Sequence, residues 1–205
     1  MYFCFAVCLV LASVASCFAD NEYRVAVAYL RTENVTGKIL FTETDEGLKV
    51  SGAIVGLEEG HYGFHVHELG DVDTCLTTGA HFNPDNIQHG GRDDEVRHVG
   101  DLGNVIFAGA EIPVSNFQFV DGTISLRGRN NILGRGLVLH EQEDDLGRGD
   151  HPDSLTTGNA GARVACAVIG MHAPVDAWHY NSSFNIGPSV SLIASILMLS
   201  FILNK

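Results

Sequence analysis

The sequence predicts an all-β domain, an eight-stranded antiparallel barrel or sandwich with almost no helix. Short extended segments rich in β-branched residues alternate with turns along most of the chain. Glycine is abundant, with 23 residues, and two stretches without strand character are too long to be simple connections. We assign the strands to residues 20–170, because a chain of 205 residues holds one ordinary domain plus terminal segments.

The predicted strands follow one another with turn residues between them. The sequence Thr44-Asp45-Glu46-Gly47 is a hairpin signal between the second and third strands. Within the third strand, Leu48, Val50 and Ile54 occupy one face and Lys49 lies on the other, as expected for a half-buried strand. The strands are expected over residues 23–30, 37–44, 48–57, 61–67, 101–108, 117–126, 136–140 and 162–170.

Two long stretches, residues 69–100 and 141–161, interrupt the succession of strands. Loops longer than about 15 residues are usually functional or disordered. These two are rich in Gly, Asp and His and are not of low complexity. We therefore interpret them as functional loops that hold or flank a site.

Both ends of the chain are predicted to be targeting segments outside the domain. Residues 1–19 form an apolar stretch ending in Cys17-Phe18-Ala19, typical of a secretory signal peptide, with a buried first strand or an anchor as the alternative. Residues 171–189 are interpreted as a stalk and residues 190–205 as a hydrophobic tail, which is either a glycosylphosphatidylinositol (GPI) anchor signal or a single membrane span. Either tail would tether the domain to the outer face of the plasma membrane; otherwise the protein is secreted.

The cysteine content agrees with export. After removal of the signal peptide, Cys75 and Cys166 remain, an even pair suited to closing a long loop in an oxidising compartment. Two unrelated buried thiols are the alternative. Sequons at Asn34 and Asn181 permit glycosylation.

The chain is strongly acidic, with a formal net charge of −13 from 25 acidic residues against 12 Lys plus Arg. It has no basic run or aromatic-interleaved basic patch, which excludes nucleic acid as a partner. An anionic substrate would be repelled at long range, so such a substrate needs a local positive funnel.

A pair of histidines lies in the fourth predicted strand, in the sequence Gly63-Phe64-His65-Val66-His67. The period of two places both imidazoles on one face while Phe64 and Val66 face the core. Two ring nitrogens on one face form half of a metal site, and two solvated rings are the alternative.

Further histidines in and after the first long loop complete two metal sets. Three imidazoles and one carboxylate make a closed four-ligand shell, as in structural zinc sites. An all-nitrogen set suits copper, which cycles between two oxidation states. Each residue alone would be an ordinary surface or hydrogen-bonded side chain, and only the joint arrangement favours metal binding. The predicted zinc ligands are His81, His89, His98 and Asp101, and the predicted copper ligands are His65, His67, His140 and the shared His81.

Six motifs in order make residues 23–170 resemble the copper,zinc superoxide dismutase family. The resemblance implies a Greek-key β-barrel (an immunoglobulin-like sandwich), the two metal sets above, and conversion of superoxide and protons to dioxygen and hydrogen peroxide. The motifs are GFHVHE at 63–68, GAHFNP at 79–84, HGG at 89–91, RHVGDLGN at 97–104, HE with DDLG within 140–147, and GNAGARVAC at 158–166.

The resemblance also implies how the residues around the metals act. His81 would bridge copper and zinc after losing its second ring proton, which is favourable only between two cations. Copper would perform the redox step, zinc would fix the ring, and His81 would take up and return a proton. Asp144 would accept hydrogen bonds from the spare nitrogens of His65 and His89 and so fix both rings.

The resemblance makes Arg163 the cation beside the copper channel, where its planar guanidinium would dock the anion. A disulfide between Cys75 and Cys166 would fix the loop that orients it. Where the family commonly places two lysines around the channel, this chain has Gln142 and Thr156. We therefore expect a slower, less salt-sensitive enzyme than a lysine-bearing relative.

A homodimer is also implied, although Leu69 replaces a usual aromatic residue near the family's dimer contact. The alternative to an enzyme is a binding module that stores or delivers copper, or an extracellular adhesive domain with a zinc-stapled loop. Copper-delivering domains of this kind tend to lose copper ligands, whereas all four are present here. Hydrolase and phosphate-loop motifs are absent from the sequence.

Overall fold

The computed structural model describes residues 23–109 and 111–178. The predicted signal peptide, residues 1–19, and the predicted tail, residues 190–205, lie outside the described residues. Within the described ranges, no helix has the length and apolar character needed to span a bilayer.

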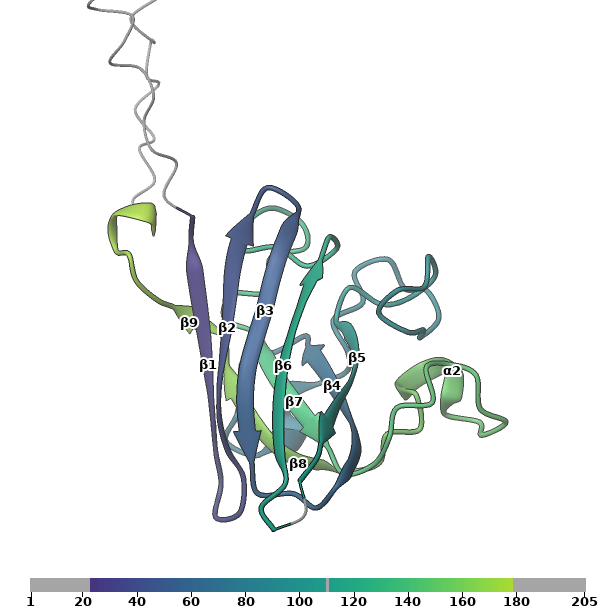
Figure 1. The fold of residues 1–205 in the computed structure, drawn as a ribbon. Coiled ribbons are helices and arrows are strands. Elements are labelled where there is room, and N and C mark those ends of the chain that lie inside the picture. The colour runs from purple at the N-terminus through teal and green to yellow at the C-terminus, as the bar shows by residue number, and fades with distance from the viewer. Residues whose placement is uncertain (1–22, 110, 179–205) are drawn as a thin grey trace, which may run out of the picture.

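Two antiparallel sheets form the body of the molecule (Figure 1). One sheet has the order β6-β3-β2-β1-β9 and the other the order β5-β4-β7-β8. The neighbours β3–β6 and β4–β7 are not consecutive in the chain, as in Greek-key connectivity, so the predicted all-β fold is confirmed. The strands are β1 (Val25–Arg31), β2 (Thr36–Thr44), β3 (Gly47–Val55), β4 (Gly60–His67), β5 (Asp101–Phe107), β6 (Val114–Asp121), β7 (Gly136–His140), β8 (Arg163–Val168) and the short β9 (Gly170–Met171).

The sixth strand differs from the prediction at both ends. It runs from Val114 to Asp121, whereas residues 117–126 were expected. Asp121 Oδ1 accepts hydrogen bonds from the backbone N–H groups of Thr123 (2.7 Å) and Ile124 (3.0 Å). An aspartate that bonds its own backbone two residues on favours a turn, which explains why the strand ends there.

The core lies between the sheets and consists of the inward faces of the strands. In β4 the expected alternation is present, because Phe64 and Val66 are buried in the core while His65 and His67 lie on the opposite face. The largest fully buried side chains include Phe41, Phe64, Phe107, Leu30, Ile39, Leu137 and Leu139.

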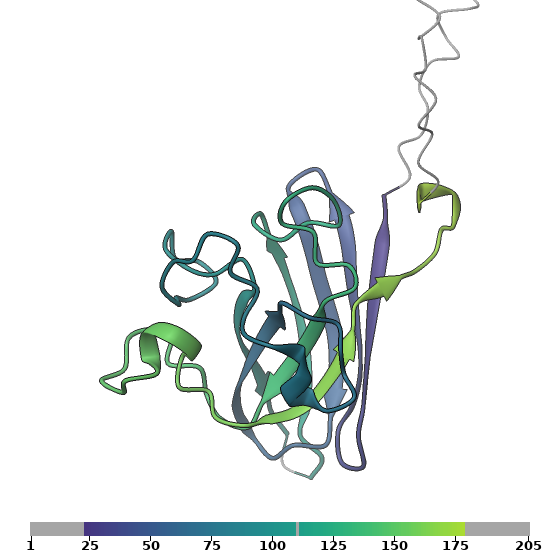
Figure 2. The ribbon, with the colours of Figure 1, turned by 180° about the vertical axis from the view of Figure 1, so that it is seen from behind.

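The two long loops project on the same side of the molecule (Figures 1 and 2). The first contains the 3-10 helix η1 (Cys75–Thr78), and the second contains the short helix α2 (Ser154–Thr157). The backbone of the first loop bonds to β4, through Phe82 N–H to Val66 O at 2.9 Å and Val66 N–H to Gly100 O at 2.9 Å. The outer faces of β4 and β7 are thereby covered, and all five residues of β7 are buried.

Residues 171–178, the beginning of the predicted stalk, lie against the body. Gly170 and Met171 pair with Val27 and Ala26 of β1. Arg24 Nε donates to Ala177 O at 3.0 Å, and its guanidinium lies 5.5 Å from the ring centroid of Trp178. The folded body therefore continues to at least Trp178.

Candidate metal centre

Strand β4 places two histidines beneath the long loops. His65 and His67 are both 0% exposed, so the solvated-ring alternative does not hold. A register shift lies between Gly63 and His65, and a second lies between Leu139 and His140 at the end of β7. Such irregularities bend a strand and re-aim its side chains, often beside functional sites.

The rings of His67 and His140 are each held by a backbone carbonyl. His67 Nδ1 lies 2.9 Å from Gly79 O, and His140 Nδ1 lies 3.1 Å from Gly161 O. A carbonyl only accepts hydrogen bonds, so both Nδ1 atoms carry the proton and both Nε2 atoms keep a lone pair. The two Nε2 atoms lie 3.4 Å apart, so these lone pairs face a common space.

The carboxylate of Asp144 holds two further rings. Its oxygens lie 2.8 Å from His65 Nε2 and 2.8 Å from His89 Nε2, with all three side chains buried. Asn104 fixes the Asp144 backbone from both sides, donating through Nδ2 to its carbonyl and accepting from its N–H, each at 2.8 Å. At Gly158, where φ is +66°, an added Cβ would overlap Asp144 Oδ1, so only glycine leaves room for this contact.

A second set of ligand atoms surrounds Asp101. Its Oδ1 lies 2.9 Å from His81 Nδ1 and 3.1 Å from His98 Nδ1, and its Oδ2 lies 3.0 Å from His89 Nδ1. Ligand atoms on a tetrahedral zinc with bonds of about 2.0–2.1 Å lie roughly 3.3 Å apart. His89 Nδ1 and Asp101 Oδ2 are close enough to form an ion pair but are not aligned as a hydrogen bond, as expected when both atoms point at a common centre.

His81 belongs to both sets. Its Nδ1 lies among the atoms around Asp101, while its Nε2 is buried without a hydrogen-bond partner. In the first set the ligand atoms of His65, His67, His81 and His140 lie within 4.8 Å of one another, and in the second so do those of His81, His89, His98 and Asp101.

Both sets fit metal ions. Within the described part of the chain, the buried ring atoms without a hydrogen-bond partner are His65 Nδ1, His81 Nε2 and His89 Nδ1, and all three belong to the two sets. An unsatisfied buried polar atom costs about 1–3 kcal/mol, which a bound ion would offset. The all-imidazole set suits copper and the mixed set suits zinc.

The comparison with known proteins identifies the family. The model of the family described as copper/zinc superoxide dismutase (SODC) matches residues 35–169. This chain belongs to the copper/zinc superoxide dismutase family.

Relatives within the family match most of the chain. It is 46% identical over 175 residues to extracellular superoxide dismutase (Cu-Zn) of Drosophila melanogaster, which covers 81% of this chain and 94% of that protein. It is 51% identical over 140 residues to superoxide dismutase (Cu-Zn) A of Xenopus laevis, covering 67% of this chain and 91% of that one. A crystal structure of the clock protein EA4 matches with a TM-score of 0.70 and 53% identity, over 74% of this chain and 96% of that chain.

In this superoxide dismutase family member, the histidines of the first set have the protonation state that metal binding requires. Burial lowers the pKa of His65 to about 3, of His67 to about 2 and of His140 to about 4. In the metal-free protein these rings are therefore neutral at pH 7, and a metal ion displaces no proton from them.

His89 behaves differently. Burial alone would lower its pKa, but the carboxylates of Asp101 and Asp144 outweigh burial and raise the pKa of His89 to about 9. Likewise, burial alone would raise the pKa of each carboxyl group, yet the surrounding histidines lower it. Metal-free His89 is therefore a cation between two carboxylates at neutral pH.

Zinc binding to the metal-free protein is expected to release about one proton per ion at pH 8, because zinc displaces the proton of His89 Nδ1. Since His89 is protonated below about pH 9, zinc affinity should rise about tenfold per pH unit up to that value. Calorimetry in two buffers of different ionisation enthalpy measures the release. Asp144→Asn should lower it, and a release of zero in the unmodified protein contradicts the assignment.

A pocket of about 580 Å³ opens over the two sets of candidate metal ligands, and Arg163 lines it together with His67, His81, His98 and His140. Arg163 lies at the start of β8, and its guanidinium is held by four acceptors on the first loop. Nη1 donates to Cys75 O (2.8 Å), Leu76 O (3.2 Å) and Thr78 Oγ1 (3.0 Å), and Nη2 donates to Gly79 O (2.7 Å).

The predicted disulfide is present and joins Cys75 of this loop to Cys166 of β8, with the Cα atoms 5.5 Å apart. It ties the loop that holds the guanidinium to the strand that carries Arg163. Gly79 O accepts hydrogen bonds from both Arg163 and His67, so the same carbonyl positions the guanidinium and one ring of the first set.

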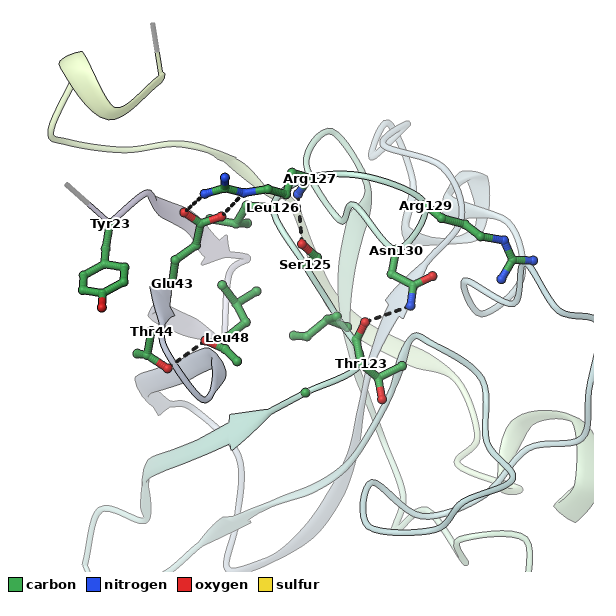
Figure 3. A pocket seen from close by; sticks show the side chains of 13 residues that line it. Tyr23, Glu43, Thr44, Leu48, Thr123, Ser125, Leu126, Arg127, Arg129 and Asn130 are labelled. Atoms are coloured by element: carbon green, nitrogen blue, oxygen red, sulfur yellow. Dashed lines mark hydrogen bonds and ion pairs between the residues drawn. The ribbon is translucent and has the colours of Figure 1, made fainter. Parts of the chain in front are cut away.

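A second pocket, of about 590 Å³, lies where no histidine lines it (Figure 3). Arg127 Nε there donates to Glu43 at 2.8 Å, and Arg129 Nη1 donates to Asp85 at 2.6 Å. Because each cation already contacts a carboxylate, this pocket has no clear preference for an ionic ligand, and we assign it no role.

The groups that anchor the rings of the centre were not predicted from the sequence. The carbonyls of Gly79 and Gly161 act through the backbone, which leaves no signal in residue type. Arg97 was also missed: it is buried, pairs with Asp121 at 2.8 Å, and donates to the backbone carbonyl of Asp101 at 2.9 Å. A buried arginine next to a histidine motif is visible in the sequence only as one more charged residue.

Proposed function

We propose that the chain is a superoxide dismutase that converts two superoxide anions and two protons to dioxygen and hydrogen peroxide. The observation that carries the proposal is the sharing of His81 by an all-histidine set and a histidine–aspartate set in one buried cluster. Copper is assigned to His65, His67, His81 and His140, and zinc to His81, His89, His98 and Asp101.

When bound, copper supplies one-electron chemistry, which accepts an electron from one superoxide and gives it to the next. The chain supplies proton handling and orientation. His81 Nε2 has no other hydrogen-bond partner and its ring lines the pocket, so it is placed to hold a proton and pass it to the substrate. Asp101 keeps the Nδ1 side of the ring in position.

Arg163 is proposed to dock superoxide. Arg163→Ala should lower kcat/KM about tenfold, because the guanidinium is the local positive charge that an acidic protein needs to attract an anion. Arg163→Lys should keep part of the rate, since the charge remains but the planar fork is lost. Stopped-flow kinetics with metal content held equal measures both. Equal rates in the wild type and the alanine variant would rule out this role.

No lysine occurs among the described residues that line the pocket, which predicts a weak salt dependence. Thr156 lines the pocket, and the resemblance to the family places Gln142 at the second position where a lysine is common. The double variant Gln142→Lys with Thr156→Lys should raise the rate severalfold at low ionic strength and steepen its fall with added salt.

A control variant distinguishes local steering from a change in net charge. Gln118→Lys with Asn116→Lys adds the same two charges at exposed positions of β6 in the first sheet and leaves the sequon at Asn34 intact. This control should leave the salt dependence close to that of the wild type. Identical slopes for the pocket variant and the wild type would refute steering from these two positions.

We also propose that the protein is extracellular and tethered to the plasma membrane through residues 190–205, by a GPI anchor or a single span. The extracellular Drosophila relative and the disulfide support export. Phosphatidylinositol-specific phospholipase C should release a GPI-anchored protein from intact cells and leave a spanning one in place.

A homodimer is proposed as well. Leu69 and Met171 are 51% and 65% exposed, apolar side chains that a partner subunit would cover. Light scattering of the purified domain measures the assembly, and a single-subunit mass at micromolar concentration would contradict it.

The test of the function is metal analysis of the purified protein alongside superoxide consumption. One copper and one zinc per chain with rapid turnover supports the enzyme. The same metal content without turnover would overturn it and favour a copper-storage or copper-delivery module.

A further inference from the structure

Three apolar side chains from separate segments surround the pocket over the metal-binding residues. Leu76 lies in η1, Ile87 in the first long loop and Leu155 in α2, and all three line the pocket. They are 76%, 41% and 47% exposed. Single exposed apolar residues are ordinary, but three that meet at one opening form a shared apolar rim.

The backbone of each rim residue is tied to the site below it. Leu76 O accepts from Arg163 Nη1 at 3.2 Å, and Leu155 O accepts from the backbone N–H of His89 at 3.0 Å. Ile87 O lies 3.0 Å from His98 Nε2. The backbone that carries each rim side chain is therefore held by the same contacts that hold the residues of the two sets, so ligand binding would need little ordering of the loops.

The described lining of the pocket carries one permanent positive charge and no carboxylate. Among the described residues that line it, Arg163 is the only Lys or Arg, and none is Asp or Glu. The rest of the lining is glycine, alanine, asparagine, threonine and the histidines. One guanidinium below an apolar rim complements a ligand with an anionic head and an apolar tail.

We propose that this pocket binds carboxylates with a short alkyl chain, the head on Arg163 and the tail on Leu76, Ile87 and Leu155. The volume of about 580 Å³ is sufficient for such a ligand. This proposal deepens the proposed function. It rests on that function in one respect only: the carboxylate would compete with superoxide for the position beside Arg163.

The test is a nuclear magnetic resonance titration of copper(I),zinc-loaded protein with acetate, butyrate and hexanoate, following the Ile87 methyl resonances. Complete burial of one methylene would lower the dissociation constant about fourfold, and partial burial against a half-open rim would lower it about twofold per methylene. The dissociation constant should therefore fall about sixteenfold from acetate to hexanoate, which differ by four methylenes. In Leu76→Ser with Leu155→Ser the three ligands should differ less than about threefold.

Two controls make the outcome decisive. Ile112→Ser removes an apolar side chain that is 73% exposed outside the pocket lining, and it should leave the chain-length series unchanged. Arg163→Gln should weaken all three carboxylates. Equal affinity for acetate and hexanoate, or a series that persists in the double variant, overturns the inference. No superoxide is present, so failure of the dismutase proposal would appear in the turnover assay and not here.

Discussion

His140→Ala is expected to lose copper and more than about a hundredfold in dismutase activity while keeping zinc. His140 belongs to the copper set and not to the set around Asp101. Loss of a direct ligand should exceed the 10–100-fold effect typical of residues that only orient ligands. Metal analysis and superoxide consumption on the same preparation measure both effects.

His61→Ala is the matched control for this variant. His61 also lies in the second sheet, but its side chain is 47% exposed and contacts Glu143 at 3.0 Å, outside both metal sets. It should keep copper, zinc and activity. Full copper occupancy together with normal turnover in the His140 variant would contradict the assigned copper site.

Loss of the Cys75–Cys166 disulfide is expected to cost about 4–5 kcal/mol of unfolding free energy. The two cysteines are 91 residues apart, and closing so long a loop removes much entropy from the unfolded chain. Urea unfolding of Cys75→Ser with Cys166→Ser, at fixed metal loading, gives the change.

The same variant should also lower kcat/KM, because the freed loop holds the guanidinium of Arg163. Wild-type protein reduced at the disulfide serves as the control and should behave like the double variant. An unfolding free energy within about 1 kcal/mol of the wild type would show that the disulfide contributes little to stability once the metals are bound.

The strands were predictable because successive side chains of a strand point to opposite faces of the sheet. His65 and His67 illustrate this, since the pattern that buries Phe64 and Val66 also fixes which way the rings point. The two metal sets could be proposed because residues that commonly bind metals recur at close spacing in the fourth strand, in and just after the first long loop, and at the end of the seventh strand. The shared role of His81 came from resemblance as much as from spacing.

Other features depend on groups that residue type does not reveal. The carbonyls of Gly79 and Gly161 select the ring tautomers, yet every residue has a carbonyl. The sixth strand ends at Asp121 because that side chain bonds the following backbone, a local choice that competes with strand propensity. Residues 171–178 pack against the start of the domain, through Met171 beside Ala26 and Trp178 beside Arg24, and these pairs are distant in sequence.

The proposed mechanism requires His81 to contact two different ions at once. Anomalous diffraction at the copper and zinc absorption edges, from crystals loaded with both metals, shows which ion lies at each ring nitrogen. We expect copper at His81 Nε2 and zinc at His81 Nδ1 in the same molecule. A map in which this imidazole touches one ion or none would contradict it.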